Sequence, residues 1–268
     1  MAGWFAHGIA SGIRTTPFPR RREEAAGVTP GLPQSTRMVN AAQAGEVASR
    51  CPTGALVAHG EEVAFDARRC IHCYRCVRGV ETPVRWSEGS EWTLRPEGDR
   101  AGLRQAGAGE ITERRLFAFE PPFRRSMNIL VVDAGDCGAC LSEVRQLAAP
   151  QYNLHRLGFF ITPTPRNADL LLVVGPVTDA MRHPLLSAWE AMPTPKRVLA
   201  VGACALTGSI FGPSFASGAG VGDLLPVDLE VPGSPPPPLA ILHALLVLSG
   251  RLELPGSPSA GTMAGEGD

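Results

Sequence analysis

The seven cysteines of the chain fall into two groups whose spacing suits metal binding. Three of them stand in CIHCYRC, where Cys70, Cys73 and Cys76 form a C-x₂-C-x₂-C run, and Cys51 precedes a proline in CPTGAL. A cysteine thiolate is a soft metal ligand. Since no secretory signal is recognisable, we expect the chain to remain in a reducing compartment, where cysteines bind metals more often than they form disulfides.

The first group matches the spacing of bacterial ferredoxins, C-x₂-C-x₂-C-x₃-C-P, in which the fourth cysteine ligates the other cluster. Cys51, with its proline, then belongs to the first half-motif, and Cys70, Cys73 and Cys76 belong to the second. Together they form one complete [4Fe–4S] site. A zinc site is the alternative, but the tight triple fits a cubane better than the paired C-x₂-C units of zinc ribbons. We expect His72 to be a solvated loop residue rather than a ligand.

The second site of such a ferredoxin lacks its cysteines in this chain. Counting by the same spacing, the positions of the lost ligands hold other residues: Ala41, Ala44, Val47 and Val80-Glu81. We therefore expect aliphatic side chains to fill that cavity. The resemblance to a ferredoxin domain that kept one cluster covers roughly residues 38–90.

The second group of cysteines follows two apolar runs. Cys137 and Cys140 lie in DAGDCGACLSEV, directly after NILVV, and Cys204 lies in VGACALTG, directly after RVLAV. If both runs are parallel strands, these loops lie at the same edge of the sheet, where α/β proteins bind ligands. The sequence therefore predicts that the three thiols converge.

Strands and helices alternate in the second half of the chain. The runs MNILVVDAG, NADLLLVVGPV and KRVLAVGAC read as buried strands, and CLSEVRQLAAP and DAMRHPLLSAWEAM have the length of helices. This alternation predicts an α/β domain with a parallel sheet. The first half has only short strand-like pieces, GALVAHG and EEVAFD, which suit a small α+β domain around the first cysteine group.

The composition divides the chain into five parts. Residues 1–126 hold 18 arginines and 14 acidic residues, whereas residues 127–268 hold 7 basic and 12 acidic residues, which favours two modules. The basic residues are scattered among acids and prolines, so we exclude nucleic-acid binding. The expected parts are an extended N-terminal arm (1–39), a ferredoxin-like domain (40–100), a linker (101–126), an α/β domain (127–252) and a disordered tail (253–268).

Four motifs of the second half identify a family resemblance. DAGDCGACLSE, NADLLLVVGPVT, VGACA and VPGSPPPP resemble the 20 kDa subunit family of respiratory complex I. They are more similar still to the small subunits of membrane-bound, energy-converting [NiFe] hydrogenases, which share the C-x₂-C pair. The likeness covers residues 127–250. It implies a flavodoxin-like domain with one [4Fe–4S] cluster, whose fourth ligand is the cysteine of a G-C-P-P motif.

In this chain Ser234 occupies the position of that fourth ligand, beside Cys137, Cys140 and Cys204. A serine oxygen is a harder donor than a thiolate, so we expect it to favour the oxidised cluster and lower its potential. The centre is then a [4Fe–4S] cluster or a [3Fe–4S] core, and the alternative is a vestigial site without a cluster. The resemblance also associates an acidic residue near Glu143 with proton movement, although a carboxylate near a helix N-terminus is ordinary.

The sequence thus predicts an iron–sulfur electron-transfer subunit of a membrane-associated respiratory oxidoreductase complex, with no complete active site of its own. The resemblance implies a catalytic large subunit carrying a [NiFe] centre or a quinone site, membrane-anchor subunits and other iron–sulfur subunits. No apolar run approaches the ~20 residues that span a bilayer. We therefore expect the subunit to be cytoplasmic and peripheral on the inner face of the cell membrane.

Three other functions stay open from the sequence. The first is a complex I-type quinone reductase subunit, and the second is a structural interaction subunit whose second cluster site is degraded. A regulatory protein that binds zinc is the third.

Overall fold

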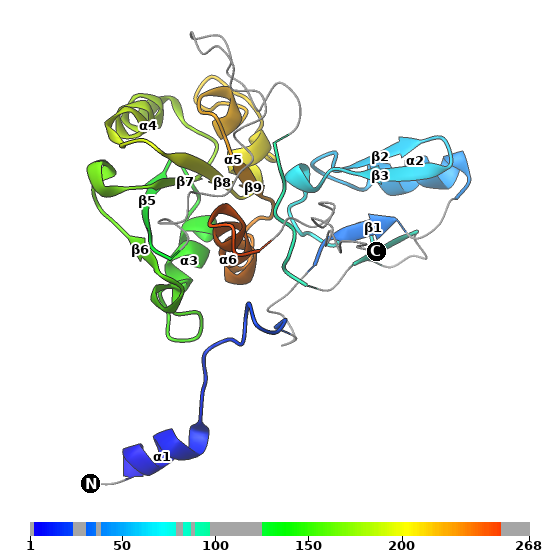
Figure 1. Ribbon diagram of the computed structural model, residues 1–268. Helices are drawn as coiled ribbons and strands as arrows, with labels where there is room; N and C mark the ends of the chain where they lie inside the picture. The colour runs from blue at the N-terminus through cyan, green and yellow to red at the C-terminus, as the bar shows by residue number, and fades with distance from the viewer. Residues whose placement is uncertain are drawn as a thin grey trace, which may run out of the picture.

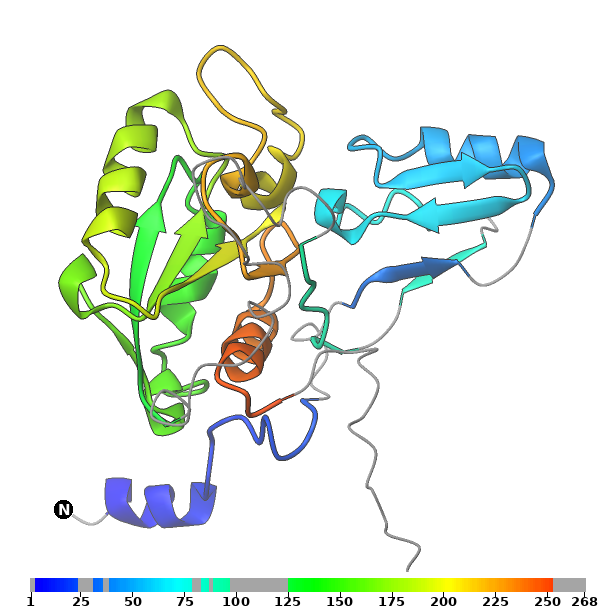
Figure 2. The same cartoon turned by 45° about the horizontal axis from the view of Figure 1, so that its top comes forward.

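The computed structural model describes residues 3–23, 31–35, 39–78, 83–86, 89–96 and 125–252. Most of the predicted linker and the whole predicted tail lie outside the described residues. Figure 1 shows a larger part with a wide twisted sheet and a smaller part with two short sheets, and Figure 2 shows the same two parts from another side.

The larger part is built on five parallel strands in the order β6-β5-β7-β8-β9. Numbered along the chain this order is 2-1-3-4-5, as in flavodoxin. The central strand, LLLVV, is buried on both faces because helices cover both sides of the sheet. The predicted α/β class and its flavodoxin-like topology are therefore confirmed. The strands are β5 (Met127–Asp133), β6 (Phe159–Ile161), β7 (Leu170–Val174), β8 (Arg197–Val201) and β9 (Leu229–Val231).

Alternate residues of β7 face two different layers of helices. Leu170 and Leu172 belong to the apolar core that includes the helices α3 and α6, whereas Leu171 and Val173 belong to the core that includes α4 and α5. Among the described residues, no helix combines the length and apolar character needed to cross a bilayer. The helices are α3 (Ala139–Gln146), α4 (Asp179–Ala191), α5 (Ala203–Thr207), α6 (Pro238–Leu248), η5 (Leu154–Leu157), η6 (Pro165–Asn167) and η7 (Val221–Asp223).

The smaller part consists of two antiparallel pairs of strands and one helix. β2 pairs with β3, and β1 pairs with β4. Ala44 and Val47 on α2 are buried in its core, as expected for residues that fill a lost cluster cavity. Ala41, by contrast, is exposed, and Val80-Glu81 lies outside the described residues. The elements are β1 (Pro33–Ser35), α2 (Ala41–Ser49), β2 (Leu56–His59), β3 (Glu62–Phe65), η1 (Ala67–Arg69) and β4 (Val84–Trp86).

The N-terminal arm is not wholly extended. It begins with the helix α1 (Gly3–Ser11), which extends away from the rest of the molecule in Figure 1. Farther along, Phe18 is buried in the core of the larger part, and Arg156 donates hydrogen bonds to the carbonyl oxygens of Thr16 and Phe18. The arm also supplies β1, so the proposed boundary at residue 40 divides a sheet of the smaller part.

A short segment after β4 joins the two parts through its backbone. Leu94 and Glu230 exchange two backbone hydrogen bonds, of 2.8 and 2.9 Å, next to the edge of the large sheet. The indole nitrogen of Trp92 donates to the carbonyl oxygen of Pro232 at 3.0 Å. The segment before the predicted linker therefore docks against the strand and loop that lead to Ser234.

Two buried side-chain contacts strengthen this joint. Arg68 Nε donates to the carboxylate of Glu230 at 2.5 Å, and both side chains are almost fully buried. Thr93 Oγ1 lies 2.6 Å from Nδ1 of His243, which is buried on α6. Burial lowers the pKa of His243 to about 4, so the ring is neutral at pH 7. Polar groups buried in this way must be paired, and the pairing fixes how the two parts meet.

We expect Glu230→Gln to lower the free energy of unfolding by about 3 kcal/mol, because it removes a buried charge opposite the Arg68 guanidinium. Chemical denaturation followed by circular dichroism measures the change. The matched control is Glu91→Gln, which breaks the exposed ion pair with Arg22 and should cost less than about 1 kcal/mol. Equal losses in the two variants would contradict a joint that depends on the buried pair.

Candidate metal centres

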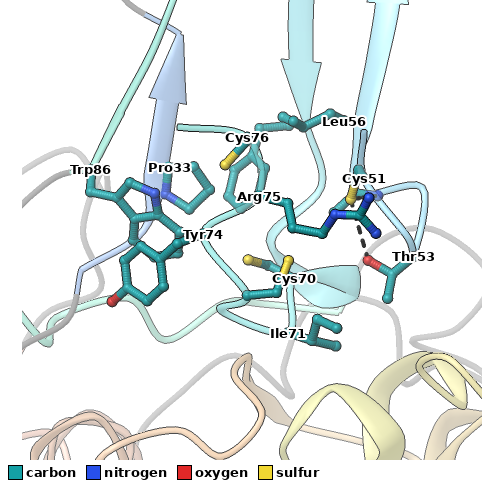
Figure 3. Close-up of a pocket in the computed structure, with 13 residues that line it drawn as sticks. Pro33, Cys51, Thr53, Leu56, Cys70, Ile71, Tyr74, Arg75, Cys76 and Trp86 are labelled. Atoms are coloured by element: carbon teal, nitrogen blue, oxygen red, sulfur yellow. Dashed lines mark hydrogen bonds between the residues drawn. The ribbon is translucent and has the colours of Figure 1, made fainter. Parts of the chain in front are cut away.

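The four cysteines of the first group line one cavity of the smaller part. Cys51 follows the end of α2, Cys70 follows η1, and Cys73 and Cys76 lie in the loop beyond. Figure 3 shows Cys51, Cys70 and Cys76 around this cavity, with Trp86 and Tyr74 along one side. Residues from separate stretches of the chain thus bring four thiols together, as the spacing predicts.

The C-x₂-C-x₂-C run bends sharply between its cysteines. His72 and Tyr74 have φ angles of 54° and 58°, in the left-handed region that residues other than glycine rarely adopt. The Tyr74 ring lies 4.1 Å from the Trp86 ring. His72 lies edge-on against both Trp86 and Trp92, at 5.5 and 5.7 Å between ring centroids. His72 is thus a loop residue, as expected, but its ring is partly buried against two indoles and is not solvated.

The electrostatics of the first group of cysteines suit a positively charged metal centre. Burial, together with the smaller effect of the neighbouring thiols, raises the pKa of Cys70 to about 12. Burial also raises the pKa of Cys51, but hydrogen bonds outweigh it and leave that pKa lowered; one comes from the Ala55 N–H at 3.2 Å. Several thiolates are stable side by side only when a positive centre compensates their charge. The donor set therefore fits an iron–sulfur cluster.

A single zinc ion is the alternative to a cluster in this group. Four thiolates on one zinc ion lie about 3.8 Å from one another, given Zn–S bonds of about 2.3 Å and tetrahedral geometry. Within the described ranges, no three His, Cys, Asp or Glu side chains are gathered closely enough to hold one ion. A cubane binds each cysteine to a different iron, so its ligands are spread more widely. Metal and sulfide analysis distinguishes the two centres.

The second group lies at the carboxyl edge of the large sheet. Cys137 and Cys140 stand between β5 and the first turn of α3, and Cys204 stands in α5 directly after β8. The three thiols are close enough to raise the pKa of Cys140, after burial and together with the carboxylate of Asp136. The loops after β5 and β8 thus lie at the same edge of the sheet, as predicted. Cys140 is buried, whereas Cys137 is exposed.

The loop that carries Ser234 is hydrogen-bonded to the segment that carries Cys204. The N–H of Ala203 donates to the carbonyl oxygen of Gly233 at 2.7 Å, one residue before Cys204 and Ser234 respectively. A Cβ atom on Gly202 would lie 2.5 Å from Cys140 Sγ and 3.5 Å from Gly233 O. Because Gly202, at φ +92°, has no Cβ atom, it leaves room for the sulfur of Cys140 beside the loop of Gly233. Ser234 itself is partly buried.

Asp136 is a site residue that the cysteine pattern did not reveal. Its carboxylate accepts hydrogen bonds from the N–H groups of Gly138 and Leu141, both at 3.0 Å. These bonds hold the loop that contains Cys137 and begin α3. An aspartate just before a helix is a recognised start signal, so the sequence did contain a hint of this role.

Glu143 lies on α3, one turn after Cys140, and is partly buried. Burial raises its pKa above the ordinary value. Its charge also contributes, after burial, to the raised pKa of Tyr152. These observations are compatible with a carboxyl group that holds a proton, and they leave the proton-relay role a prediction.

Comparison with known proteins covers mainly the second half of the chain. Residues 137–248 match the family described as "NADH ubiquinone oxidoreductase, 20 Kd subunit". The chain is 39% identical to formate hydrogenlyase subunit 7 of Escherichia coli over 130 residues, which cover 48% of this chain and 51% of that protein. It therefore spans about half the length of that relative.

Two further relatives are covered over most of their length. The chain is 39% identical to the probable membrane-bound hydrogenase subunit mbhJ of Pyrococcus furiosus, over 52% of this chain and 84% of that protein. It is 38% identical to an NADH-quinone oxidoreductase subunit of Carboxydothermus hydrogenoformans, over 43% of this chain and 70% of that protein.

Among solved structures, a chain of the membrane-bound sulfane sulfur reductase, an archaeal respiratory membrane complex, matches with a TM-score of 0.44 and 31% identity. That match covers 49% of this chain and 75% of that one. The extent and identity of the sequence matches show that the chain belongs to the family of the 20 kDa subunit of NADH ubiquinone oxidoreductase.

Proposed function

We propose that the protein is the iron–sulfur electron-transfer subunit of a membrane-associated respiratory oxidoreductase complex related to energy-converting hydrogenases and NADH-quinone oxidoreductases. Members of this family carry an iron–sulfur cluster and work as subunits of multi-subunit complexes. The observation that carries the proposal is that two separate sets of cysteines converge, one in each part of the chain. Iron–sulfur clusters take up and release one electron at a time.

The first centre is proposed to be a [4Fe–4S] cluster held by Cys51, Cys70, Cys73 and Cys76. All four line one cavity, and the N–H donors around Cys51 favour its thiolate form. This half of the chain lies outside residues 137–248, so it adds a redox centre to the family domain.

The second centre is proposed to be held by Cys137, Cys140 and Cys204, with Ser234 as the fourth ligand of a [4Fe–4S] cluster. A [3Fe–4S] core is the alternative if the serine does not bind. The contact between Gly233 and Ala203 supports the proposal, because it keeps the serine loop beside the cysteine loops. Glu143 is proposed to relay protons near this centre.

An apolar loop beside the second centre is proposed to bind the catalytic large subunit. Ile210, Phe211 and Phe215 are exposed, the last almost completely, and they follow Cys204 closely in the chain. Val221 and Leu225, which follow the same loop, are buried in the core and do not belong to this surface. Membrane-anchor subunits and other iron–sulfur subunits complete the proposed assembly, on the cytoplasmic face of the membrane. The large subunit carries either a [NiFe] centre or a quinone site.

The serine at position 234, in place of a fourth cysteine, favours one alternative function, that of a structural subunit. A family domain with three thiols could have lost its cluster and kept a structural role. The subunit would then bind its partners and carry only the first centre.

Iron and sulfide analysis of the anaerobically reconstituted full chain tests the number of centres. We expect about eight irons per chain, with Cys73→Ala and Cys140→Ala each removing about four. Each variant is the control for the other, because the two sites lie in different parts. About four irons in the unmodified chain, unaffected by Cys140→Ala, would support the structural alternative, and zinc without sulfide would contradict both.

Replacement of Ser234 tests the fourth ligand. We expect Ser234→Cys to increase cluster occupancy and to raise the reduction potential of the second centre, because a thiolate is a softer donor than an alkoxide. Ser234→Ala should favour the three-iron form. EPR spectra of oxidised and reduced samples distinguish these states.

The matched control is Ser214→Cys, which adds a thiol to an exposed loop of the same part. If no variant shows a second paramagnetic centre and Ser234→Cys behaves like Ser214→Cys, the second centre does not exist.

Gly202→Ala should abolish the second centre and leave the first intact. The new methyl group would lie 2.5 Å from Cys140 Sγ, on a backbone with φ +92°, so the sulfur would have to move. Iron content and the EPR spectrum measure the loss. Gly45→Ala on α2 is the control, because a Cβ there meets nothing within 4 Å and alanine favours helix. Full iron content in Gly202→Ala would show that Cys140 is not a ligand.

A further inference from the structure

Two ring nitrogens next to the first centre are buried without a partner. Among the residues that the structure describes, His72 Nε2 and Trp86 Nε1 are the buried side-chain polar atoms that form no hydrogen bond. Leaving a buried donor unpaired is costly, and native proteins rarely accept it without a reason. Each of these atoms therefore lacks the partner that a buried polar group requires.

Trp86 is the one of the two that faces the cysteines. It lines the same cavity as Cys51, Cys70, Cys73 and Cys76, whereas His72 is not among the lining residues and lies against Trp86 and Trp92. Figure 3 shows the Trp86 ring beside Tyr74 at the edge of the cavity, on the same side as Pro33. Burial raises the pKa of Cys76, and Trp86 is one of the groups that oppose this rise. The indole N–H is thus near the sulfur without forming a hydrogen bond of normal geometry.

The position of Trp86 is firmly held. It ends β4, which is paired with β1 through the register of Pro33 with Trp86. Its ring packs against the rings of both Tyr74 and His72. The N–H group therefore cannot turn to solvent without breaking the strand pair or the aromatic layer.

We propose that Trp86 Nε1–H donates a hydrogen bond to a sulfur atom of the iron–sulfur centre in the first site and thereby raises its reduction potential. An indole nitrogen can only donate, and a thiolate or sulfide that carries negative charge is the acceptor the cavity would supply. Hydrogen bonds to the sulfurs are one of the means by which proteins set cluster potentials. Reduction adds negative charge, so an N–H donor stabilises the reduced form. The inference rests on the proposed presence of a cluster in this site.

Trp92 provides a natural control. It touches the same His72 ring and is also buried, but its indole N–H already donates to Pro232 O at 3.0 Å. Its replacement disturbs the aromatic layer without removing a donor from the cavity.

The test compares Trp86→Phe with Trp92→Phe in the full chain, reconstituted anaerobically. A Cys140→Ala background leaves the first centre as the source of the EPR signal. We expect both variants to bind iron and sulfide as the parent does. Trp86→Phe should shift the ratio of reduced to oxidised centre at a given potential about tenfold toward oxidised, which is about 59 mV for one electron. Trp92→Phe should leave the potential unchanged.

A second measurement does not depend on how the variants fold. Electron–nuclear double resonance on the reduced parent, labelled with ¹⁵N-indole tryptophan, should show coupling to one indole nitrogen and to one exchangeable proton. Trp86→Phe should abolish both couplings and Trp92→Phe should retain them. Absence of both couplings in the parent would overturn the inference while leaving the proposed function intact. Absence of any cluster in the parent would overturn the proposed function and the inference with it.

Discussion

The buried ion pair between Arg68 and Glu230 sets how the two candidate centres are placed. Arg68 stands two residues before Cys70, and Glu230 stands four residues before Ser234, so their contact aligns one ligand loop with the other. The hydrogen bonds of residues 92–94 surround this pair. Polar contacts of this kind are directional and costly to leave unmade. They determine orientation in a way that apolar packing between two parts does not.

The larger part could be predicted well from the sequence because its signals are local. Each apolar run that ends in glycine became a buried parallel strand, and the cysteines that follow β5 and β8 had to meet at one edge of the sheet. The spacing of the first group likewise brought four thiols to one cavity. Ligand roles and cluster types remain predictions, since they concern groups other than the chain itself.

The joint and the aromatic layer could not be predicted, because they depend on pairs far apart in sequence. Arg68 and Glu230 are separated by 162 positions, and no periodicity links them. His72 looked like a solvated residue because it lies in a polar cysteine loop, yet Trp86 and Trp92 enclose it from β4 and from the segment beyond. Propensity and spacing describe neighbours along the chain, whereas these contacts are decided by tertiary packing.

The docking of residues 92–94 against the large sheet also bears on how such subunits can be rebuilt. A designer who exchanged the N-terminal half for another redox module would take Arg68 away from Glu230 and Thr93 away from His243. The C-terminal half would then expose an apolar surface around α6. This surface would carry the carboxylate of Glu230 and the imidazole of His243, which are buried in the intact chain. The two halves can therefore be exchanged only together with these contacts, even though the family match covers residues of one half.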